Sequence, residues 1–294
     1  MDFWETMLGQ QEVADRISEI ARRAAAAAPT ALAVDGHHYP SGTIDCAFEL
    51  SSGSIFTADA KAVDRLLPSG LRPVRLRRSG RALVVAIASD WQWRLDGMPP
   101  VHSADIAVSA FVSSTDRPEP PIWKMFLGST RPGARYGFGV HWLTWLTTDA
   151  VSAGAFSHVL GVPTTLVDVR EVRGPQRTTF TATDDDHMVL ELEVAVGQES
   201  KRNADPPTTG GPALECYRGY GARNGRLAGW SVTCVDVGGA QRAGRRSARL
   251  AIGDHPAVEV LGPLQVSQHS IGAMNRDSGR EVYEGPVPLR SEAI

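Results

Sequence analysis

The 294-residue sequence predicts a mainly β protein, an antiparallel barrel or sandwich with a few short helices. Two observations lead to this class. Most apolar segments are short, rich in β-branched and aromatic residues, and bounded by Gly, Pro, Ser or Asp, as strands are. Helical patterns interrupt these segments at only two places after the N-terminal region, too seldom for an alternating α/β fold.

The N-terminal residues predict a separate amphipathic helix over 2–28. Val13, Ile17 and Ile20 recur at helical spacing, a run of alanines follows, and Pro29 ends the pattern. The polar face of this helix is short of basic residues, which favours packing on the same chain or on a partner subunit over binding to a membrane surface. We therefore expect an N-terminal arm over 1–35 and a single β domain over 36–294.

The strands and two further helices follow in order. One helix is predicted over 59–68, and a second starts with a Thr/Asp cap near Asp149 and stops at Gly161. The polar, Gly- and Pro-rich residues 197–213 predict a lid or a linker. The predicted strands cover 43–50, 54–58, 82–88, 105–112, 136–146, 165–172, 177–183, 187–196, 214–221, 229–237, 245–252 and 257–266.

Composition and charge exclude several classes of protein. The net charge of −3 and the pI near 6.2 argue against a nucleic-acid partner. The sequence has no long apolar run and no secretory leader pattern, so we expect a cytoplasmic protein without a membrane partner. Three cysteines without CxxC spacing and eight histidines without HxH or HExxH spacing predict neither a metal site nor a disulfide framework, and we expect no cofactor.

Residues 149–169, DAVSAGAFSHVLGVPTTLVDV, resemble the helix–turn–strand signature of the acetoacetate decarboxylase family, where an Ala-rich helix leads to a Gly-aromatic-Pro-Lys-Lys-Leu turn. Residues 59–71, 105–112 and 245–266 resemble other family segments in the same order, so the resemblance covers roughly residues 40–285. It implies the family's cone-shaped antiparallel β-barrel around a buried pocket. It also implies a homo-oligomer, a dimer or larger.

The resemblance also implies that the family's chemistry is missing from this chain. In the family, one lysine forms a Schiff base with a β-keto acid, and its neighbour lowers the pKa of that amine. The resemblance places Thr164 and Thr165 at these two positions, and a hydroxyl cannot form an imine. It places Thr57 at a substrate-side arginine, Ser103 at an active-site glutamate and His158 at the glutamate of an Arg–Glu pair.

Two other residues are candidates for the lost catalytic function. Lys124 lies beside Trp123 in the apolar segment PPIWKMFLG, where a lowered amine pKa would allow a relocated Schiff base. Its alternative is a lysine that reaches solvent from an aromatic patch. His158, one helical turn before the Gly-Val-Pro turn, is a general acid or base if it faces the pocket, and otherwise a structural histidine.

The predicted strand over 136–146 supplies candidate binding residues. Phe138, Trp142 and Thr144 share one face under strict alternation, and we expect this face to line the pocket with Thr144 near Thr164. A pocket without charge, lined by Trp, Thr and Ser, suits a bulky neutral ligand. We therefore expect an enzyme that isomerises, cyclises or rearranges a hydrophobic intermediate such as a polyketide, with a pericyclic rearrangement among these reactions. The alternatives are a lyase or aldolase that uses Lys124, and a non-catalytic ligand carrier or sensor.

Overall fold

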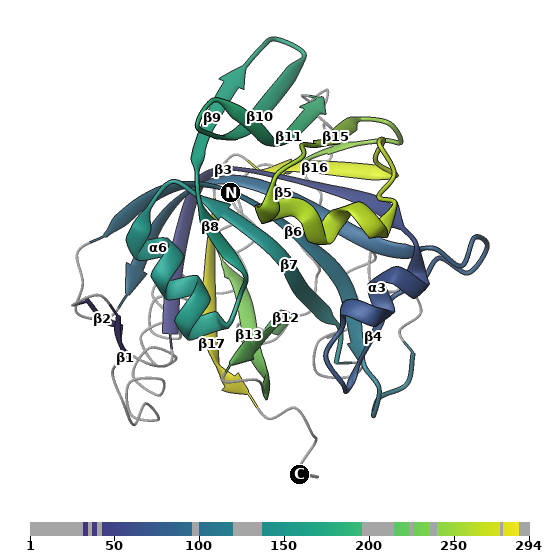
Figure 1. Cartoon of the computed structure of the whole chain (residues 1–294), viewed down its shortest axis with the longest axis horizontal. Helices are drawn as coiled ribbons and strands as arrows, with labels where there is room; N and C mark the ends of the chain where they lie inside the picture. The colour runs from purple at the N-terminus through teal and green to yellow at the C-terminus, as the bar shows by residue number, and fades with distance from the viewer. Residues whose placement is uncertain are drawn as a thin grey trace, which may run out of the picture.

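The computed structural model describes residues 32–34, 37–39, 43–95, 100–119, 137–195, 215–223, 226–235, 240–276 and 279–287, and it confirms the mainly β class (Figure 1). The predicted N-terminal helix, Trp123, Lys124 and the 197–213 segment lie outside these residues. No helix in the described residues is long and apolar enough to cross a membrane. The strands are β1 Leu32–Val34, β2 His37–Tyr39, β3 Thr43–Ala58, β4 Leu71–Pro73, β5 Ala82–Leu95, β6 Val101–Ser114, β7 Gly139–Thr147, β8 Thr164–Leu166, β9 Asp168–Arg173, β10 Arg177–Asp184, β11 His187–Ala195, β12 Glu215–Arg223, β13 Arg226–Val235, β14 Ala240–Ala243, β15 Ala248–Ile252, β16 Gly272–Arg276 and β17 Gly279–Val287.

The main sheet curves into a barrel. Strand β3 pairs with β5, and the pairing continues through β6, β7, β12, β13 and β17 back to β3. Every pair in this ring is antiparallel except β7 with β12, which is parallel. Strands β4, β8, β14 and β16 extend the sheet from the ring. The hydrogen-bonded pairings thus return to their starting strand, and one face of each strand looks into the barrel.

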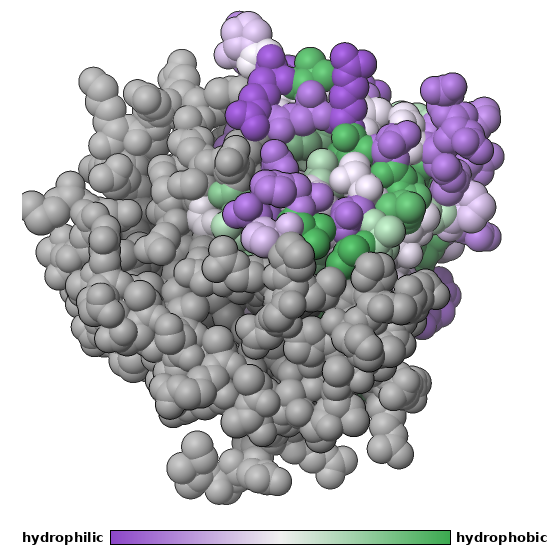
Figure 2. All heavy atoms as spheres, turned by 90° about the vertical axis from the view of Figure 1, so that its left-hand side faces the viewer, coloured by the Kyte–Doolittle hydropathy of each residue, from purple (hydrophilic) through white to green (hydrophobic). Residues whose placement is uncertain are grey.

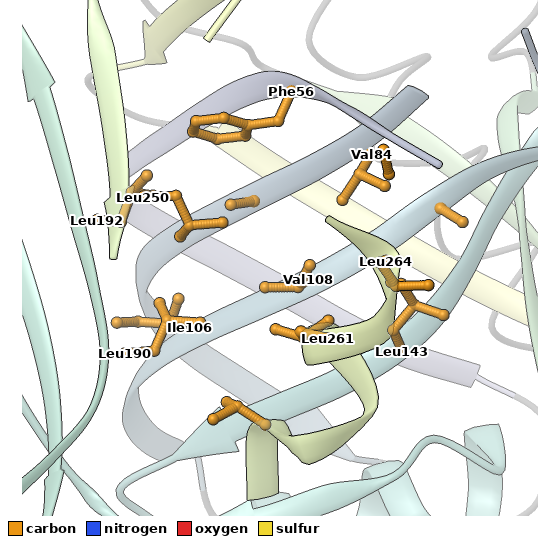
Figure 3. Packing of buried hydrophobic residues seen from close by; sticks show 14 of the residues in the cluster. Phe56, Val84, Ile106, Val108, Leu143, Leu190, Leu192, Leu250, Leu261 and Leu264 are labelled. Atoms are coloured by element: carbon orange, nitrogen blue, oxygen red, sulfur yellow. The ribbon is translucent and has the colours of Figure 1, made fainter. Parts of the chain in front are cut away.

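A second layer covers the outside of the barrel. It consists of the four-stranded sheet β15-β11-β10-β9 above the barrel, helix α3 (Ala60–Leu66) and the 3₁₀ helix η2 (Pro256–Leu264) (Figure 1). Alternate residues of β5 and β6, such as Val84 and Ile106, pack outward against Leu192, Leu250 and Leu261 in one large apolar core (Figure 3). Burial of this face specifies the register of both strands.

The outward surface of the second layer is mostly polar. Hydrophilic side chains predominate at the top of the face in Figure 2, with smaller apolar areas between them. Among the described residues of β8, β9 and β11, the large apolar side chains that remain exposed are those of Leu166, Val172 and Met188. This pattern is typical of a sheet with one solvated face.

Both predicted helices in the β domain are present, and the second has its predicted cap at Asp149. Asp59 begins α3 by accepting a hydrogen bond from the Ala62 N–H at 2.7 Å. Asp149 likewise accepts from the Ser152 N–H at 2.7 Å and begins α6 (Ala150–Ala155). Helix α6 continues into the π-helical turn η1 (Phe156–Leu160), which ends at Gly161 with φ of 66°. Glycine adopts this left-handed conformation without the strain of a side chain.

The strand predicted over 257–266 is wrong, because this segment forms the 3₁₀ helix η2. Pro263 lacks the N–H that a sheet ladder needs, and Pro256 at the first turn, with His255 as cap, favours a helix start. Val258, Leu261 and Leu264 recur every three residues, so a helix with three residues per turn buries all of them on one face. The apolar composition alone did not distinguish this pattern from a strand.

Candidate active site

A row of polar side chains crosses the inner wall of the barrel. Directly opposite residues on neighbouring strands are Arg276 with Ser51, Ser51 with Ser89, Ser89 with Asp105, and Asp105 with Thr147. Residues opposite each other in adjacent strands have their side chains on the same face of the sheet. The row therefore runs from β16 through β3, β5 and β6 to β7, and it has a charged group near each end.

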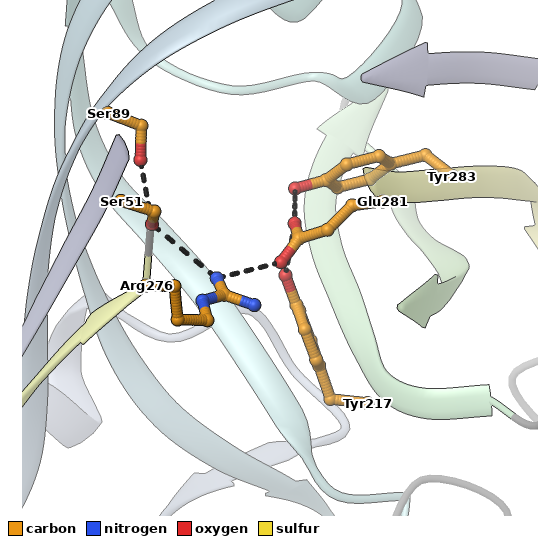
Figure 4. A network of polar contacts seen from close by, with 6 residues as sticks. All are labelled: Ser51, Ser89, Tyr217, Arg276, Glu281 and Tyr283. Atoms are coloured by element: carbon orange, nitrogen blue, oxygen red, sulfur yellow. Dashed lines mark hydrogen bonds and ion pairs between the residues drawn. The ribbon is translucent and has the colours of Figure 1, made fainter. Parts of the chain in front are cut away.

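The first end of the row is a buried network around Glu281 on β17 (Figure 4). The hydroxyls of Tyr217 and Tyr283 donate to Glu281 Oε2 at 3.2 and 3.0 Å, and Arg276 Nη2 donates to Oε1 at 3.2 Å. Arg276 also donates to Ser51 Oγ at 3.5 Å. Glu281 is only 3% exposed, so these donors replace the water that would otherwise solvate the carboxylate.

The chemistry available to this network is proton transfer. A carboxylate surrounded by hydroxyl donors can accept a proton, and a tyrosine hydroxyl can return one. Burial raises the pKa of the Tyr283 hydroxyl well above its usual range, and the neighbouring Tyr217 and Glu281 raise it further. Tyr283 therefore keeps its proton at neutral pH and remains a hydrogen-bond donor. The Arg276 guanidinium also lies over the Phe48 ring, 4.6 Å from its centroid, which fixes its position.

The other end of the row is the carboxyl of Asp105 on β6. Burial raises the pKa of Asp105 to about 7, and the nearby Asp149 charge adds to the rise. Thr147, Trp145 and Ser103 lie close enough to oppose this rise in part, but neither carboxyl oxygen has a hydrogen-bond partner within the described chain. The indole Nε1 of Trp145 is equally buried and equally without a partner there.

Aromatic rings lie in the interior between the two ends. The ring of Trp142 lies 6.4 Å from Tyr283 and 6.0 Å from Trp145, measured between centroids. Trp145 stacks on Phe156 of η1 at 4.3 Å. Trp142 also lies against the backbone of Gly219, where a Cβ would come within 2.0 Å of the indole, so only glycine leaves room for this ring. These contacts hold the aromatic side chains in defined orientations.

The two threonines of the Gly-Val-Pro turn lie on opposite faces of β8. Thr164 is opposite Trp145 on β7, on the inner face, and its Oγ1 donates to the Val162 carbonyl oxygen at 3.0 Å. Thr165 is opposite Leu146, which belongs to the outer apolar core. Both threonines are partly buried. Alternation along a strand thus separates the two hydroxyls, and Thr164 is the one directed toward the aromatic interior.

The predicted position of Thr144 in the pocket is wrong. A register shift between Val108 and Ser109 of β6 adds one residue to β7, so Trp142 and Trp145 both belong to the inner cluster while Thr144 faces outward. The Thr144 hydroxyl donates to the Ala257 carbonyl oxygen of η2 at 2.8 Å. The hydroxyl therefore connects β7 to the outer layer and does not approach Thr164.

We expect Thr144→Val to lower the free energy of unfolding by about 1 kcal/mol, because it removes one hydrogen bond and leaves the Ala257 carbonyl without it. Urea denaturation followed by circular dichroism measures this change. Thr148→Val, which removes an exposed hydrogen bond from the Ala104 N–H at 3.0 Å that water can replace, is the comparison variant and should cost less. Equal stability of Thr144→Val and the unmodified protein would contradict the outward orientation.

The remaining predicted site residues are dispersed. Thr57 lies near the end of β3, where its hydroxyl accepts from Arg81 Nε at 3.0 Å. Ser103 lies two residues before Asp105 and accepts from Trp93 Nε1 at 2.7 Å. Phe138 stacks on Phe111 with 5.5 Å between ring centroids. His158 lies within η1. Of these residues, Ser103 lies next to a titratable group, the carboxyl of Asp105.

The expectation of an interior without charge is also wrong, since Arg276, Glu281 and Asp105 all face the inside of the barrel. Arg276 and Glu281 lie on β16 and β17, which the sequence analysis did not predict as strands. The alternation of Glu281 and Tyr283 with their neighbours in GREVYEGPV was a local signal for a strand. Their partner Tyr217 is 64 positions away from Glu281, and no local pattern connects the two.

Comparisons with known proteins support the fold through structure alone. No protein-family model matches the sequence, and no curated protein matches it in sequence. Similar solved structures include the enduracididine biosynthesis enzyme MppR complexed with pyruvate (TM-score 0.58, 14% identity, covering 86% of this chain and 91% of that one). Acetoacetate decarboxylase from Legionella pneumophila is also similar (TM-score 0.59, 10% identity, covering 88% of this chain and 90% of that one). So is an acetoacetate decarboxylase-like enzyme from Sphingomonas wittichii RW1 (TM-score 0.55, 14% identity, covering 85% of this chain and 94% of that one). The described chain therefore has the acetoacetate decarboxylase-like fold.

Proposed function

We propose that this chain is an enzyme, a divergent member of the acetoacetate decarboxylase family that works without a Schiff base. It isomerises or cyclises a bulky, largely apolar keto compound, such as a polyketide intermediate, by moving a proton. The observation that carries this proposal is the buried Tyr217–Glu281–Tyr283 network with Arg276, which adjoins the aromatic interior. Threonines at 164 and 165, in place of an amine pair, support a mechanism without an imine.

The network suits abstraction of a proton from a carbon next to a carbonyl group. Glu281 takes the proton as a general base, and the hydroxyls of Tyr217 and Tyr283 lie within hydrogen-bond distance to share it or return it. The positive charge of Arg276 favours the negative charge that develops on the carbonyl oxygen. In an unsaturated ketone, return of the proton to the far carbon of the conjugated enolate moves the double bond, and attack of an enolate on a second carbonyl, with the proton delivered to the new alkoxide, closes a ring.

Deuterium exchange tests the proposal without knowledge of the natural substrate. The protein is incubated in D₂O with acetophenone, 2-tetralone and 1-phenylbutane-1,3-dione, and incorporation next to the carbonyl is measured by mass spectrometry. We expect catalysed exchange with at least one ketone, and a loss of about 100-fold or more in Glu281→Gln, as is typical for a general base. Thr144→Val, which lies outside the network, is the control and should retain the exchange rate.

Borohydride trapping distinguishes the alternative with a relocated lysine. With pyruvate and borohydride, we expect no covalent adduct in the intact mass of the protein. An adduct that maps to Lys124 would favour a Schiff-base lyase or aldolase and contradict the proposed mechanism. Exchange that persists in Glu281→Gln would contradict the role of the carboxylate, and exchange with none of the ketones would favour a carrier.

A further inference from the structure

A second polar pair lies in the same barrel, away from Glu281. Asp105 is 1% exposed and Trp145 is 3% exposed, and both side chains point into the barrel. Thr147, Trp145 and Ser103 lie near enough to the Asp105 carboxyl to lower its pKa, but neither its oxygens nor Trp145 Nε1 meets hydrogen-bond geometry with another group in the described part of the chain. Buried polar groups in proteins are nearly always paired, so two neighbouring groups of this kind indicate a place where a ligand supplies the partner.

We propose that Asp105 and Trp145 form a second polar subsite, which binds an uncharged group that both donates and accepts a hydrogen bond, a hydroxyl or a carboxamide, on the ligand that reacts at Glu281. The inference rests on the proposed function insofar as it assigns both sites to one ligand. The subsite itself is defined by the side chains of β6 and β7 alone.

The hydrogen-bonding character of the pair selects the ligand group. An indole N–H only donates, and a carboxylate only accepts, so together they match a group with one acceptor and one donor. A cationic amine would pair with the Asp105 carboxylate but would leave the Trp145 N–H without an acceptor. An anion has no donor for the Asp105 carboxylate, and the charge of the nearby Asp149 disfavours it further. A hydroxyl or carboxamide satisfies both groups at once.

One small group cannot serve both ends of the polar row. Three strand spacings separate Arg276 on β16 from Asp105 on β6, or about 14 Å along the wall at about 4.8 Å per spacing. Between them lie hydroxyls of Ser51 and Ser89 and the aromatic rings of the interior. A ligand that reaches both ends is therefore elongated and apolar in the middle, with a polar group at each end.

The subsite is held in position by its neighbours. Trp145 stacks on Phe156 with 29° between the ring planes, which fixes the direction of its N–H. Trp93, beside Trp145, is fixed by its own hydrogen bond to Ser103. A pair whose side chains are already oriented loses little conformational entropy when a ligand binds. These contacts favour a preformed subsite over one that assembles around the ligand.

A panel of matched small aromatic compounds tests the subsite. Binding of benzyl alcohol, benzamide, benzylamine, benzoate and toluene is measured by ligand-observed NMR titration with the full chain at pH 8.5, where the Asp105 carboxyl is ionised. We expect benzyl alcohol and benzamide to bind about 10-fold more tightly than toluene, as two added hydrogen bonds predict. Benzoate should show no such gain, and any gain of benzylamine, which pairs with Asp105 alone, should be unaffected by Trp145→Phe. Equal binding of benzyl alcohol, benzamide and toluene would overturn the proposal, as would a gain of benzylamine that Trp145→Phe removes.

Four variants assign the preference to the named side chains. Asp105→Leu and Trp145→Phe each remove one hydrogen-bonding group while keeping an apolar side chain, and both should reduce the preference over toluene at least about 3-fold. Trp230→Phe is the matched control, because Trp230 is equally buried and its Nε1 also lacks a partner in the described chain. Unchanged preference in Asp105→Leu and Trp145→Phe would refute the assignment. Glu281→Gln should retain the preference, which separates failure of this subsite from failure of the proposed reaction.

Discussion

Asp105→Asn is expected to stabilise the protein strongly at pH 8 and to change its stability little near pH 4. The folded protein holds the pKa of Asp105 at about 7, against an ordinary value of 3.8. Between these values the folded state binds a proton that the unfolded state has lost, so stability of the unmodified protein falls as the pH rises. The loss approaches about 4 kcal/mol above pH 7, at about 1.4 kcal/mol per pKa unit. Asparagine carries no charge at any of these pH values.

Thermal and urea unfolding at pH 4, 6 and 8 measures this effect. The difference in free energy of unfolding between Asp105→Asn and the unmodified protein should grow between pH 4 and pH 7 and then level off. Ser109 is also buried on β6 but carries no titratable group, so Ser109→Ala should differ from the unmodified protein by the same free energy of unfolding at every pH. A difference that is the same at pH 4 and pH 8 for Asp105→Asn would mean that the carboxyl is not buried as described.

Arg276→Met is the second substitution with a large expected effect, a loss of about 3–5 kcal/mol in the free energy of unfolding. Arg276 supplies the positive charge next to Glu281, and both side chains are largely buried, at 13% and 4% exposed. Methionine fills part of the volume but leaves a buried carboxylate without its counter-charge. The two tyrosine hydroxyls that remain on Glu281 reduce the cost only in part.

A double variant separates loss of charge from loss of packing. Arg276→Met combined with Glu281→Gln removes both charges, and we expect it to be more stable than Arg276→Met alone. Tyr283→Phe removes one neutral donor and should cost only about 1–2 kcal/mol. Urea denaturation at neutral pH compares the three proteins. If Arg276→Met loses less than Tyr283→Phe, the ion pair is not the main support of the Glu281 carboxylate.

Much of the fold could be predicted because its signals are local. Asp59 and Asp149 accept hydrogen bonds from backbone N–H groups only three residues away, and Gly161 adopts its left-handed conformation within a single turn. Short segments rich in β-branched and aromatic residues, bounded by Gly, Pro, Ser or Asp, likewise predicted β5, β6, β10 and β11. The one wrong strand, over 257–266, had the apolar composition of a strand but a three-residue period.

The site could be predicted only in part because its residues meet across long separations. The row from Arg276 to Asp105 exists only when β16, β3, β5 and β6 pair in one register. Thr144 shows how sensitive such a row is, since one extra residue in β7 moves it from the inner face to the outer one. No pattern near Thr144 distinguishes these two positions.

The sequence by itself determined the mainly β class, the helix ends and the absence of an amine pair at Thr164 and Thr165, because residue type and near neighbours set these properties. Only the tertiary structure decided which face of β7 looks inward, that Glu281 meets Tyr217 and Arg276, and that Asp105 is buried with no hydrogen-bond partner among the described residues. Strand register and burial depend on residues that are distant along the chain. They are therefore set when the barrel closes.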